Sequence, residues 1–392
     1  MRVLLISHLW PREDFPHLGI FVAEQAVELA RLCELEVISP LDLTPRLEEF
    51  NPQEIFAGFS KYRLRTSPLY SEIGGIKPTA LPFKAGFLRR MFAVGAARRL
   101  ADALKRIRPA ACDLVHAHTL FPDGLACSIW LNGRPVPLIV TAHGSDVHSM
   151  ASGVRYSLGR ILRRADKIVT VSRDLKNRLS ELGASAQKME FVPNGFSADL
   201  FDLQVRPVRD PHLVVFLGRL SGVKQVDLLI RAIRHCRDEI RLEIAGDGPD
   251  RGRLEALVDH LRLRRRVQFR GLVSREEVPA FLSRASLLCL VSGREGWPTV
   301  IFESLACGTP VLATAVGGIP EALCREDYGE LVPVDVNSEE LARRIQAALL
   351  RKWDEENLRA YARGFTWKML AQRLFLLYRK AVEEKSGNAT ND

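Results

Sequence analysis

Two glutamates in the last third of the chain stand where a ligand with hydroxyl and phosphate groups could bind. Glu295 and Glu303, with seven residues between them, belong to the stretch Gly-Arg-Glu-Gly-Trp-Pro-Thr-Val-Ile-Phe-Glu. Each carboxylate can accept hydrogen bonds from vicinal hydroxyls. The N–H groups of a helix expected to begin near Thr299 would suit a phosphate between them. We therefore predict a ligand whose diphosphate is flanked by hydroxyls, with two ordinary surface glutamates as the alternative.

Two cations follow the strand expected at Leu213–Leu217. Arg219 and Lys224, in Phe-Leu-Gly-Arg-Leu-Ser-Gly-Val-Lys, would lie at the carboxyl end of that strand. There they could bind an anionic ligand such as a diphosphate, although a solvated pair at a helix start is the alternative. No Asp-x-Asp motif stands at a strand end and none of the seven cysteines forms a CxxC pair, so we expect no metal site and buried, reduced thiols.

Polar residues of the first half also fall at expected strand ends. His118 and Asp123 occur in His-Ala-His-Thr-Leu-Phe-Pro-Asp, and His143 and Asp146 occur in Val-Thr-Ala-His-Gly-Ser-Asp. Gly19 lies directly before an expected helix. Histidines in loops are more often surface residues than catalytic ones, so these positions become candidates only through the arrangement of the whole chain.

Short β-branched strands alternate with amphipathic helices along both halves, which predicts two parallel sheets covered by helices. In the first half we expect strands at Arg2–Ser7, Glu36–Ser39, Asp113–His118, Leu138–His143 and Lys167–Ser172, and helices that include Ile20–Cys33, Gly124–Leu131 and Arg173–Leu182. In the second half we expect strands at Leu213–Leu217, Arg241–Ala245, Val267–Arg270, Leu287–Ser292 and Val311–Thr314, and helices at Gln225–His235, Arg251–Leu263, Glu276–Ala285 and Thr299–Ala306.

These patterns predict an N-terminal domain at 1–195, a linker at 196–212 and a C-terminal domain at 213–367. The amphipathic stretch 368–385 predicts a last helix, which we expect to pack back on the first domain. Ligands of doubly wound α/β sheets bind at the carboxyl ends of the strands. Most of the candidate residues above follow such ends, whereas Glu303 lies in the helix expected at Thr299–Ala306 and Gly19 directly before a helix.

The motifs together resemble those of the retaining glycosyltransferases of family GT4. The Glu-x7-Glu signature is followed by Ala-Cys-Gly-Thr-Pro-Val-Leu-Ala-Thr-Ala-Val-Gly-Gly-Ile-Pro-Glu. The resemblance covers nearly the whole chain and is strongest from Val214 to Glu321. It implies an α/β protein of the GT-B fold, with two Rossmann-like doubly wound domains facing a central cleft. The first domain would lie on the acceptor side, and the second would bind the nucleotide-sugar donor.

The resemblance also implies a role for each candidate. Arg219 and Lys224 would bind the donor diphosphate, Glu303 would hold the ribose hydroxyls, and Glu295 would lie near the transferred sugar. The implied catalytic set is His143, Arg219, Lys224 and Glu295; the donor site adds Gly19, Gly246, Gly296, Trp297, Pro298, Thr299, Val300 and Glu303, and the acceptor side has His118, Asp123 and Asp146. In that family the leaving phosphate is thought to accept the proton, so no side chain is named as a general base.

The family pattern is not followed everywhere. Many relatives carry Lys-Gly where this chain has Lys224-Gln225, and Gly-Gly where it has Leu18-Gly19. These departures affect the turn after Lys224 and the approach of the first glycine loop to a ligand.

Charge is concentrated in one segment of the chain. The 392 residues carry a formal net charge of +9, and the segment 84–108 holds eight basic residues against one acid, Asp102. A second basic cluster comprises Arg155, Arg160, Arg163, Arg164 and Lys167. Basic segments with interspersed apolar residues are typical of helices at an anionic membrane surface, but a helix that packs its apolar side on the core fits equally well. No motif indicates nucleic-acid binding.

No run of about 18 apolar residues occurs, and the first ten residues are too short for a signal peptide, so we expect a cytoplasmic protein. Its basic segments also fit a peripheral position at the inner face of the membrane. We expect it to move a sugar from a UDP- or GDP-sugar to a saccharide or lipid-linked acceptor, with retention of anomeric configuration, in cell-surface polysaccharide biosynthesis. Two alternatives are a nucleotide-sugar epimerase of the same fold and a non-catalytic nucleotide-sugar-binding subunit.

Overall fold

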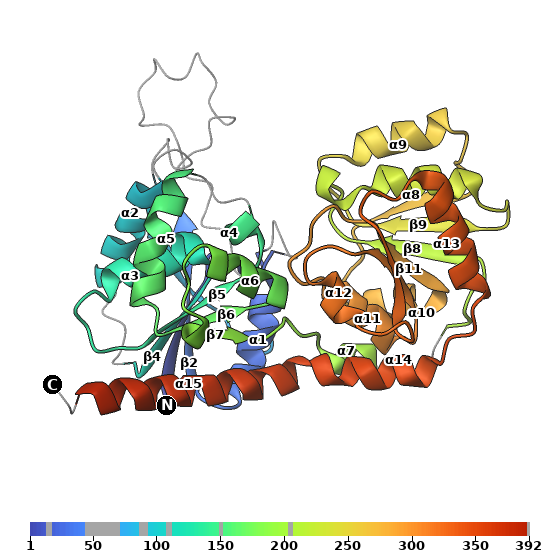
Figure 1. Ribbon diagram of the computed structural model, residues 1–392. Helices are drawn as coiled ribbons and strands as arrows, with labels where there is room; N and C mark the ends of the chain where they lie inside the picture. Colours follow the sequence, from blue (N-terminus) through green and yellow to red (C-terminus); the bar gives the residue numbers. More distant parts are fainter. Residues whose placement is uncertain are drawn as a thin grey trace, which may run out of the picture. The chain divides into compact units, whose positions relative to one another are not determined.

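The computed structural model describes residues 1–12, 18–43, 71–85, 93–106, 112–148, 152–202 and 207–389. They form two compact units, each with one parallel sheet and its helices (Figure 1). Unit 1 comprises Met1–Pro193 and Leu370–Asp392, and unit 2 comprises Asn194–Met369. The predicted α/β architecture with two parallel sheets is confirmed.

Unit 1 has a seven-stranded sheet in the order β3-β2-β1-β4-β5-β6-β7. The strands are β1 (Arg2–Ile6), β2 (Glu34–Asp42), β3 (Thr79–Phe83), β4 (Leu114–His118), β5 (Leu138–Ala142), β6 (Lys167–Thr170) and β7 (Met189–Phe191). The helices are α1 (Ile20–Ala30), α2 (Ala93–Arg106), η4 (Leu120–Gly124), α3 (Leu125–Trp130), α4 (Ser145–His148), α5 (Ser152–Arg164), α6 (Arg173–Glu181) and η5 (Ala186–Lys188).

The two strands of unit 1 that the sequence pattern missed are both at the edges of the sheet. β3 contains a proline and buries only Leu81, and β7 has only three residues. An edge strand has one neighbour and less apolar contact, so its pattern is weaker. The central strands β4 and β5 are buried at every position, which is why their apolar runs were readable.

Unit 2 has a six-stranded sheet in the order β10-β9-β8-β11-β12-β13. The strands are β8 (Leu213–Leu217), β9 (Arg241–Ala245), β10 (Val267–Gly271), β11 (Leu287–Leu290), β12 (Val311–Thr314) and β13 (Gly329–Val332). The helices are α7 (Ala198–Phe201), η6 (Gly222–Lys224), α8 (Val226–His235), α9 (Arg251–His260), α10 (Val278–Arg284), α11 (Val300–Ala306), α12 (Ile319–Ala322), α13 (Ser338–Leu350), α14 (Glu355–Ala362), η7 (Arg363–Phe365) and α15 (Trp367–Ala389).

The segment predicted as a linker, 196–212, is grouped with unit 2 and begins with regular structure. Phe196 donates its N–H to the carbonyl of Phe365 and accepts a hydrogen bond from the N–H of Trp367. Its ring packs edge-on against Phe201 of α7, and both side chains are buried. These apolar contacts attach the segment to unit 2, whereas its prolines and charges had suggested an unattached connection.

The last helix, α15, begins in unit 2 and contributes its residues from Leu370 onward to unit 1 (Figure 1). Leu370, Leu374 and Tyr378 are buried, as expected from their helical spacing. Two ion pairs between side chains also join this helix to unit 1, Lys167–Glu384 and Lys385–Asp166.

Within the basic segment 84–108, the structure describes 84–85 and α2. The apolar side of α2 is buried and includes Ala97, Leu100 and Leu104, while Arg98 and Arg106 are exposed. The described helix therefore packs its apolar face on the core and offers only charge to the outside. The interspersed apolar residues from Phe87 to Phe92, and the side chain of Arg155, lie outside what is described.

Candidate functional site

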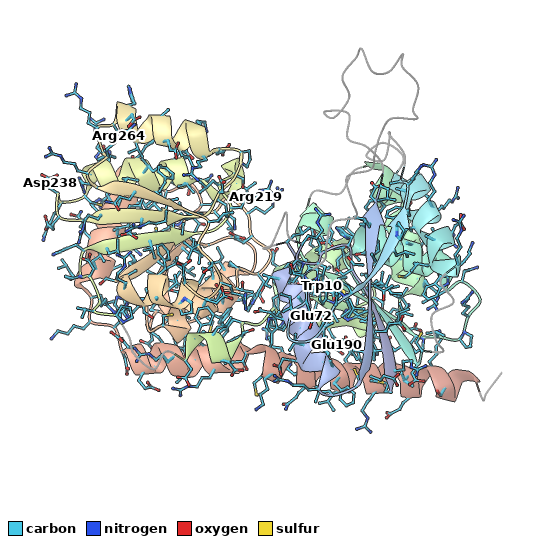
Figure 2. All side chains as sticks on the ribbon, turned by 180° about the vertical axis from the view of Figure 1, so that it is seen from behind. Trp10, Glu72, Glu190, Arg219, Asp238 and Arg264 are labelled. Atoms are coloured by element: carbon cyan, nitrogen blue, oxygen red, sulfur yellow. The ribbon has the colours of Figure 1, made fainter. Side chains whose placement is uncertain are left out.

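The central strands of unit 2, β8 and β11, mark a topological switch point. The chain continues from β8 to one side of the sheet and from β11 to the other, which is the strand order of dinucleotide-binding folds. The loop after β8 carries Arg219 and Lys224, and the loop after β11 carries Glu295. Figure 2 shows Arg219 and Asp238 at opposite ends of this sheet. The structure thus brings the predicted cations and one predicted glutamate to one edge.

Lys224 and Glu295 form an ion pair across the switch point. Lys224 Nζ donates to Glu295 Oε1 at 2.5 Å, and Ser292 Oγ donates to the same oxygen at 2.6 Å. The Glu295 side chain is 10% exposed and that of Lys224 is 23% exposed. Arg219 is exposed, with no hydrogen bond or ion pair among the described residues. The pair therefore offers a fixed ammonium group, and Arg219 a free guanidinium, at the same strand ends.

Two glycines let the surrounding loops approach each other closely. A Cβ at Gly246, whose φ is +130°, would lie 1.9 Å from the carbonyl oxygen of Gly218, the residue before Arg219. A Cβ at Gly317, whose φ is +53°, would lie 1.8 Å from the carbonyl oxygen of Glu295. Any other residue would displace the loops that carry Arg219 and Glu295. Gly246 was predicted for the donor site; its observed contact is with the loop that presents the cations.

Glu303 lies one turn into α11 and is partly exposed. Burial raises its pKa to about 7, although the nearby Arg275 favours the charged form. Such a carboxyl group is poised to ionise when hydroxyl donors bind to it. Arg275, on the loop between β10 and α10, did not stand out in the sequence because a single arginine in a loop has no distinguishing pattern.

The residues Gly296 to Val300 connect Glu295 to α11. Trp297 and Pro298 are buried, and Trp297 donates its indole N–H to the carbonyl of Asn194 at 3.0 Å while its ring stacks on Phe302. Their side chains therefore anchor the loop, so only the backbone of this stretch can face a ligand. Thr299 caps α11 without a side-chain hydrogen bond, which leaves the first turn open to an external acceptor.

In unit 1 the corresponding switch point lies between β1 and β4. His118, the last residue of β4, and His143, directly after β5, stack with ring centroids 5.3 Å apart. His118 Nδ1 and His143 Nε2 are 3.1 Å apart and share a hydrogen bond. Burial lowers the pKa of His143 to about 3 and that of His118 well below its usual value, so both rings are neutral near pH 7. His143 Nδ1 and His118 Nε2 have no partner among the described residues.

Asp146 holds the two strand-end loops together. One carboxylate oxygen accepts the N–H groups of His143 and Gly144 at 3.0 and 2.9 Å, and the other accepts the N–H of Leu120 at 2.8 Å. Burial raises the pKa of Asp146, which these backbone N–H groups partly offset. Asp146 was predicted on the acceptor side, but its oxygens are occupied by the backbone, so its observed role is to position His143.

Asp123 pairs with a residue that sequence reasoning missed, His8. Its Oδ2 accepts the His8 N–H at 3.1 Å and lies 2.8 Å from His8 Nδ1. The sequence signal that could have identified His8 is its position, because it follows the first strand just as His143 follows another.

Gly19, with φ +67°, caps α1 and packs so tightly on Leu9 that a Cβ would lie 2.5 Å from the Leu9 carbonyl carbon.

His116, which stands two residues before His118 on β4, links this region to the last helix. Its Nδ1 lies 2.6 Å from the hydroxyl of Tyr378 on α15, and its Nε2 lies 2.7 Å from Thr141 Oγ1. The rings of His116 and His118 are 4.4 Å apart. Tyr378 of the C-terminal helix therefore holds His116, whose ring packs against His118 of the histidine pair.

Among the described residues, no group of three or more His, Cys, Asp or Glu is placed to hold a metal ion. Within the same residues, no helix has the length and apolar character needed to cross a membrane.

Known families match both units. The model of Glycosyltransferase Family 4 matches residues 18–200, and that of Glycosyl transferases group 1 matches residues 202–365. The chain is 30% identical over 280 residues to an uncharacterized glycosyltransferase of Methanocaldococcus jannaschii, covering 70% of this chain and 76% of that protein. It is 28% identical over 345 residues to a putative teichuronic acid biosynthesis glycosyltransferase of Bacillus subtilis, covering 81% and 82%.

Solved structures agree on the fold. The sucrose-phosphate synthase of Thermosynechococcus elongatus superposes with a TM-score of 0.75 at 22% identity, covering 97% of this chain and 98% of that one. Anabaena HepE in complex with UDP and glucose superposes with a TM-score of 0.71 at 18% identity, covering 97% and 100%. Two Rossmann-like units with this strand order are the architecture of the GT-B fold. The chain belongs to the group 1 glycosyltransferases of family 4, so the expected enzyme class is confirmed.

Proposed function

We propose that this glycosyltransferase moves a sugar from a nucleotide-diphosphate sugar, with UDP as the favoured nucleotide, to a saccharide or lipid-linked acceptor in cell-surface polysaccharide biosynthesis. The observation that carries the donor site is the Lys224–Glu295 ion pair at the switch point of unit 2, on the strand ends that also present Arg219. The Anabaena neighbour solved with UDP and glucose supports the choice of UDP, and the Bacillus relative supports polysaccharide biosynthesis.

The unit 2 residues would stabilise charge as the bond between the anomeric carbon and the diphosphate breaks. Lys224 and Arg219 supply positive charge where the leaving diphosphate forms, so no divalent cation is required in this proposal. Glu303 would accept hydrogen bonds from the ribose hydroxyls, and Glu295 would lie beside the sugar. Retention of anomeric configuration, which the family resemblance implies, remains part of the proposal and would be read from the product by NMR.

Donor binding is tested by thermal shift with UDP, GDP, ADP and TDP, followed by their sugar conjugates, all in EDTA. A ligand that binds only the folded state raises the melting temperature as its concentration rises. We expect UDP to stabilise the protein and expect Glu303→Ala and Arg219→Ala to lose that effect, with Glu326→Ala as an exposed control. No shift from any nucleotide, or a shift that needs manganese, would contradict the proposed site.

The two alternative functions, an epimerase and a non-catalytic binding subunit, predict different results with the same nucleotide sugars. An epimerase would convert the donor with no acceptor present, and a non-catalytic subunit would bind the donor without ever releasing the nucleotide. The Lys224–Glu295 pair favours transfer, because a fixed ammonium group at the diphosphate position assists departure of a leaving group.

Association with an anionic membrane surface would rest on charge alone in the described part of unit 1. Arg98 and Arg106 on α2 and Arg160 on α5 are exposed. We expect the protein to pellet with vesicles of 30% anionic lipid at low salt and to be released at 0.5 M salt, because screening weakens such contacts. Failure to pellet at low salt would remove the membrane from the proposal.

A further inference from the structure

Arg209, in the segment that leads into β8, bonds to the ends of two helices at once. Its Nη1 donates to the carbonyl of Ala285, at the end of α10, and to Thr309 Oγ1 at 2.7 Å. Its Nη2 donates to the carbonyls of Cys307 and Gly308, at the end of α11, at 3.3 and 3.2 Å. The side chain is 25% exposed. One guanidinium group therefore joins α10 to α11.

The end of α11 needs no arginine to satisfy its own backbone. Thr309 donates its N–H to the carbonyl of Ser304 at 2.9 Å, and Gly308, with φ +73°, donates its N–H to the carbonyl of Leu305 at 2.9 Å. These two bonds and the left-handed glycine form a Schellman motif, which closes a helix without help from a side chain. The bonds from Arg209 are therefore additional to the cap of α11, and what they add is the attachment to α10.

Neighbouring contacts fix Arg209 in place. The next residue, Asp210, donates its N–H to the carbonyl of Arg284, the last residue of α10, at 2.9 Å. Glu355 of α14 pairs with Arg209 Nε at 3.4 Å and also pairs with Arg359 of the same helix. Contacts with α10 and α14 therefore hold the guanidinium group against the ends of α10 and α11.

The two helices that Arg209 joins lead to charged residues of the candidate donor site. α10 follows the loop that carries Arg275, and Glu303 lies on α11. The guanidinium group of Arg275 is near enough to Glu303 to favour its ionised form. Cys307 donates its N–H to the carbonyl of Glu303 at 3.3 Å, so the helical turn that Arg209 contacts is the turn that begins at Glu303. A shift of α11 against α10 would therefore move Glu303 relative to Arg275.

We propose that Arg209 is a positioning residue of the donor site, which fixes Glu303 where it can hold the ribose hydroxyls of the nucleotide. This inference rests on the proposed function, in which Glu303 accepts those hydrogen bonds. Arg209 touches no ligand itself and acts through the position of α11. A guanidinium group is suited to this task because its planar fork of five N–H donors can reach several acceptors at once, whereas the ammonium group of lysine is a single point charge. Arg209→Lys therefore retains the charge and loses the connection between the helices.

The test compares the affinities for UDP and 2′-deoxy-UDP, measured by isothermal titration calorimetry at pH 8. The two ligands differ in one ribose hydroxyl, so the ratio of their affinities reports the contact with Glu303 and not the contacts with the phosphates. We expect the wild type to prefer UDP by about tenfold or more, because the deoxy compound lacks a hydrogen bond to a charged group. Arg209→Lys should reduce this preference to less than about threefold, whereas Arg234→Lys, at an exposed position of α8, should keep it.

Two further variants separate positioning from stability. Thr309→Val removes one acceptor of Arg209 without changing any charge and should reduce the preference in the same way, so the test does not depend on the folding of Arg209→Lys alone. Glu303→Gln should itself lower the preference, and adding Arg209→Lys to it should change the ratio no further, because Arg209 acts through Glu303. A general loss of stability would weaken both ligands alike and leave the ratio unchanged.

The possible failures of the inference and of the proposed function can be told apart. A folded Arg209→Lys variant with the wild-type preference for UDP would overturn the positioning role. Equal affinity of the wild type for the two ligands would contradict the contact between Glu303 and the ribose, and with it the positioning role that depends on that contact. A wild type that binds neither ligand would contradict the proposed donor site itself.

Discussion

Lys224→Met is expected to lower the rate of UDP release from UDP-glucose by about 10²- to 10³-fold, the usual loss when one group that stabilises a leaving anion is removed. Lys224 is the cation that the structure holds in place, through Glu295 Oε1 at 2.5 Å. Methionine keeps the length of the side chain and removes the charge. The measurement is the steady-state rate at saturating donor, with KM determined separately.

The variant also leaves Glu295 partly buried without its cation, so its stability must be followed. The double variant Lys224→Met with Glu295→Gln removes both charges and should recover stability without recovering the rate. Lys352→Met, at an exposed position after α13, is the matched control and should behave as the wild type. If Lys224→Met loses less than threefold in rate while remaining folded, Lys224 has no part in the departure of the diphosphate.

The affinity for UDP-glucose is expected to increase about tenfold between pH 6 and pH 8. Burial raises the pKa of Glu303 to about 7 in the free protein. Donated ribose hydroxyls would favour the ionised form, and the ionised fraction of a group with that pKa rises from about one tenth to about nine tenths over this range. UDP-glucose is the suitable probe because its diphosphate is esterified at both ends and lacks the titration near pH 6 of a terminal phosphate.

Glu303→Gln should abolish this pH dependence and weaken binding at pH 8 by at least tenfold, as measured by isothermal titration calorimetry; Glu326→Gln is the exposed control. The contribution of Glu303 to the free energy of unfolding of the ligand-free protein should decrease as the pH rises, whereas the affinity for UDP-glucose increases. The pKa of Glu303 is higher in the folded state, so its contribution is fully present below about pH 4.5 and is lost as the pH rises through 7. The same slope of affinity with pH in Glu303→Gln would show that another group titrates.

Much of unit 2 could be predicted from the sequence because its strands are nearly continuous apolar runs. The limits expected for β8, β9 and β12 agree with those observed. The residues that follow such strands can be placed at one edge of the sheet by topology alone, which is why the sequence predicts Arg219, Lys224 and Glu295 at the same edge.

What could not be predicted depends on contacts between segments distant in the sequence. The burial of the Trp297 indole depends on its hydrogen bond to Asn194, 103 positions away, which no local pattern indicates. His8 carried no motif, and only its approach to Asp123, 115 positions away, distinguishes it. The apolar side of α2 could have faced lipid or protein with the same periodicity, because an amphipathic pattern does not specify its partner.

The packing of α15 on unit 1 has a consequence for how the protein is made. The sheet of unit 1 ends at Phe191, yet the helix that covers His116 with Tyr378 begins only at Trp367, after nearly all of unit 2 has been synthesised. At about 5 to 20 residues per second, the ribosome needs roughly 10 to 35 s to cover that interval. During this time the surface that receives Leu370, Leu374 and Tyr378 is bare. The nascent unit 1 therefore exposes this surface until the last part of the chain has been synthesised.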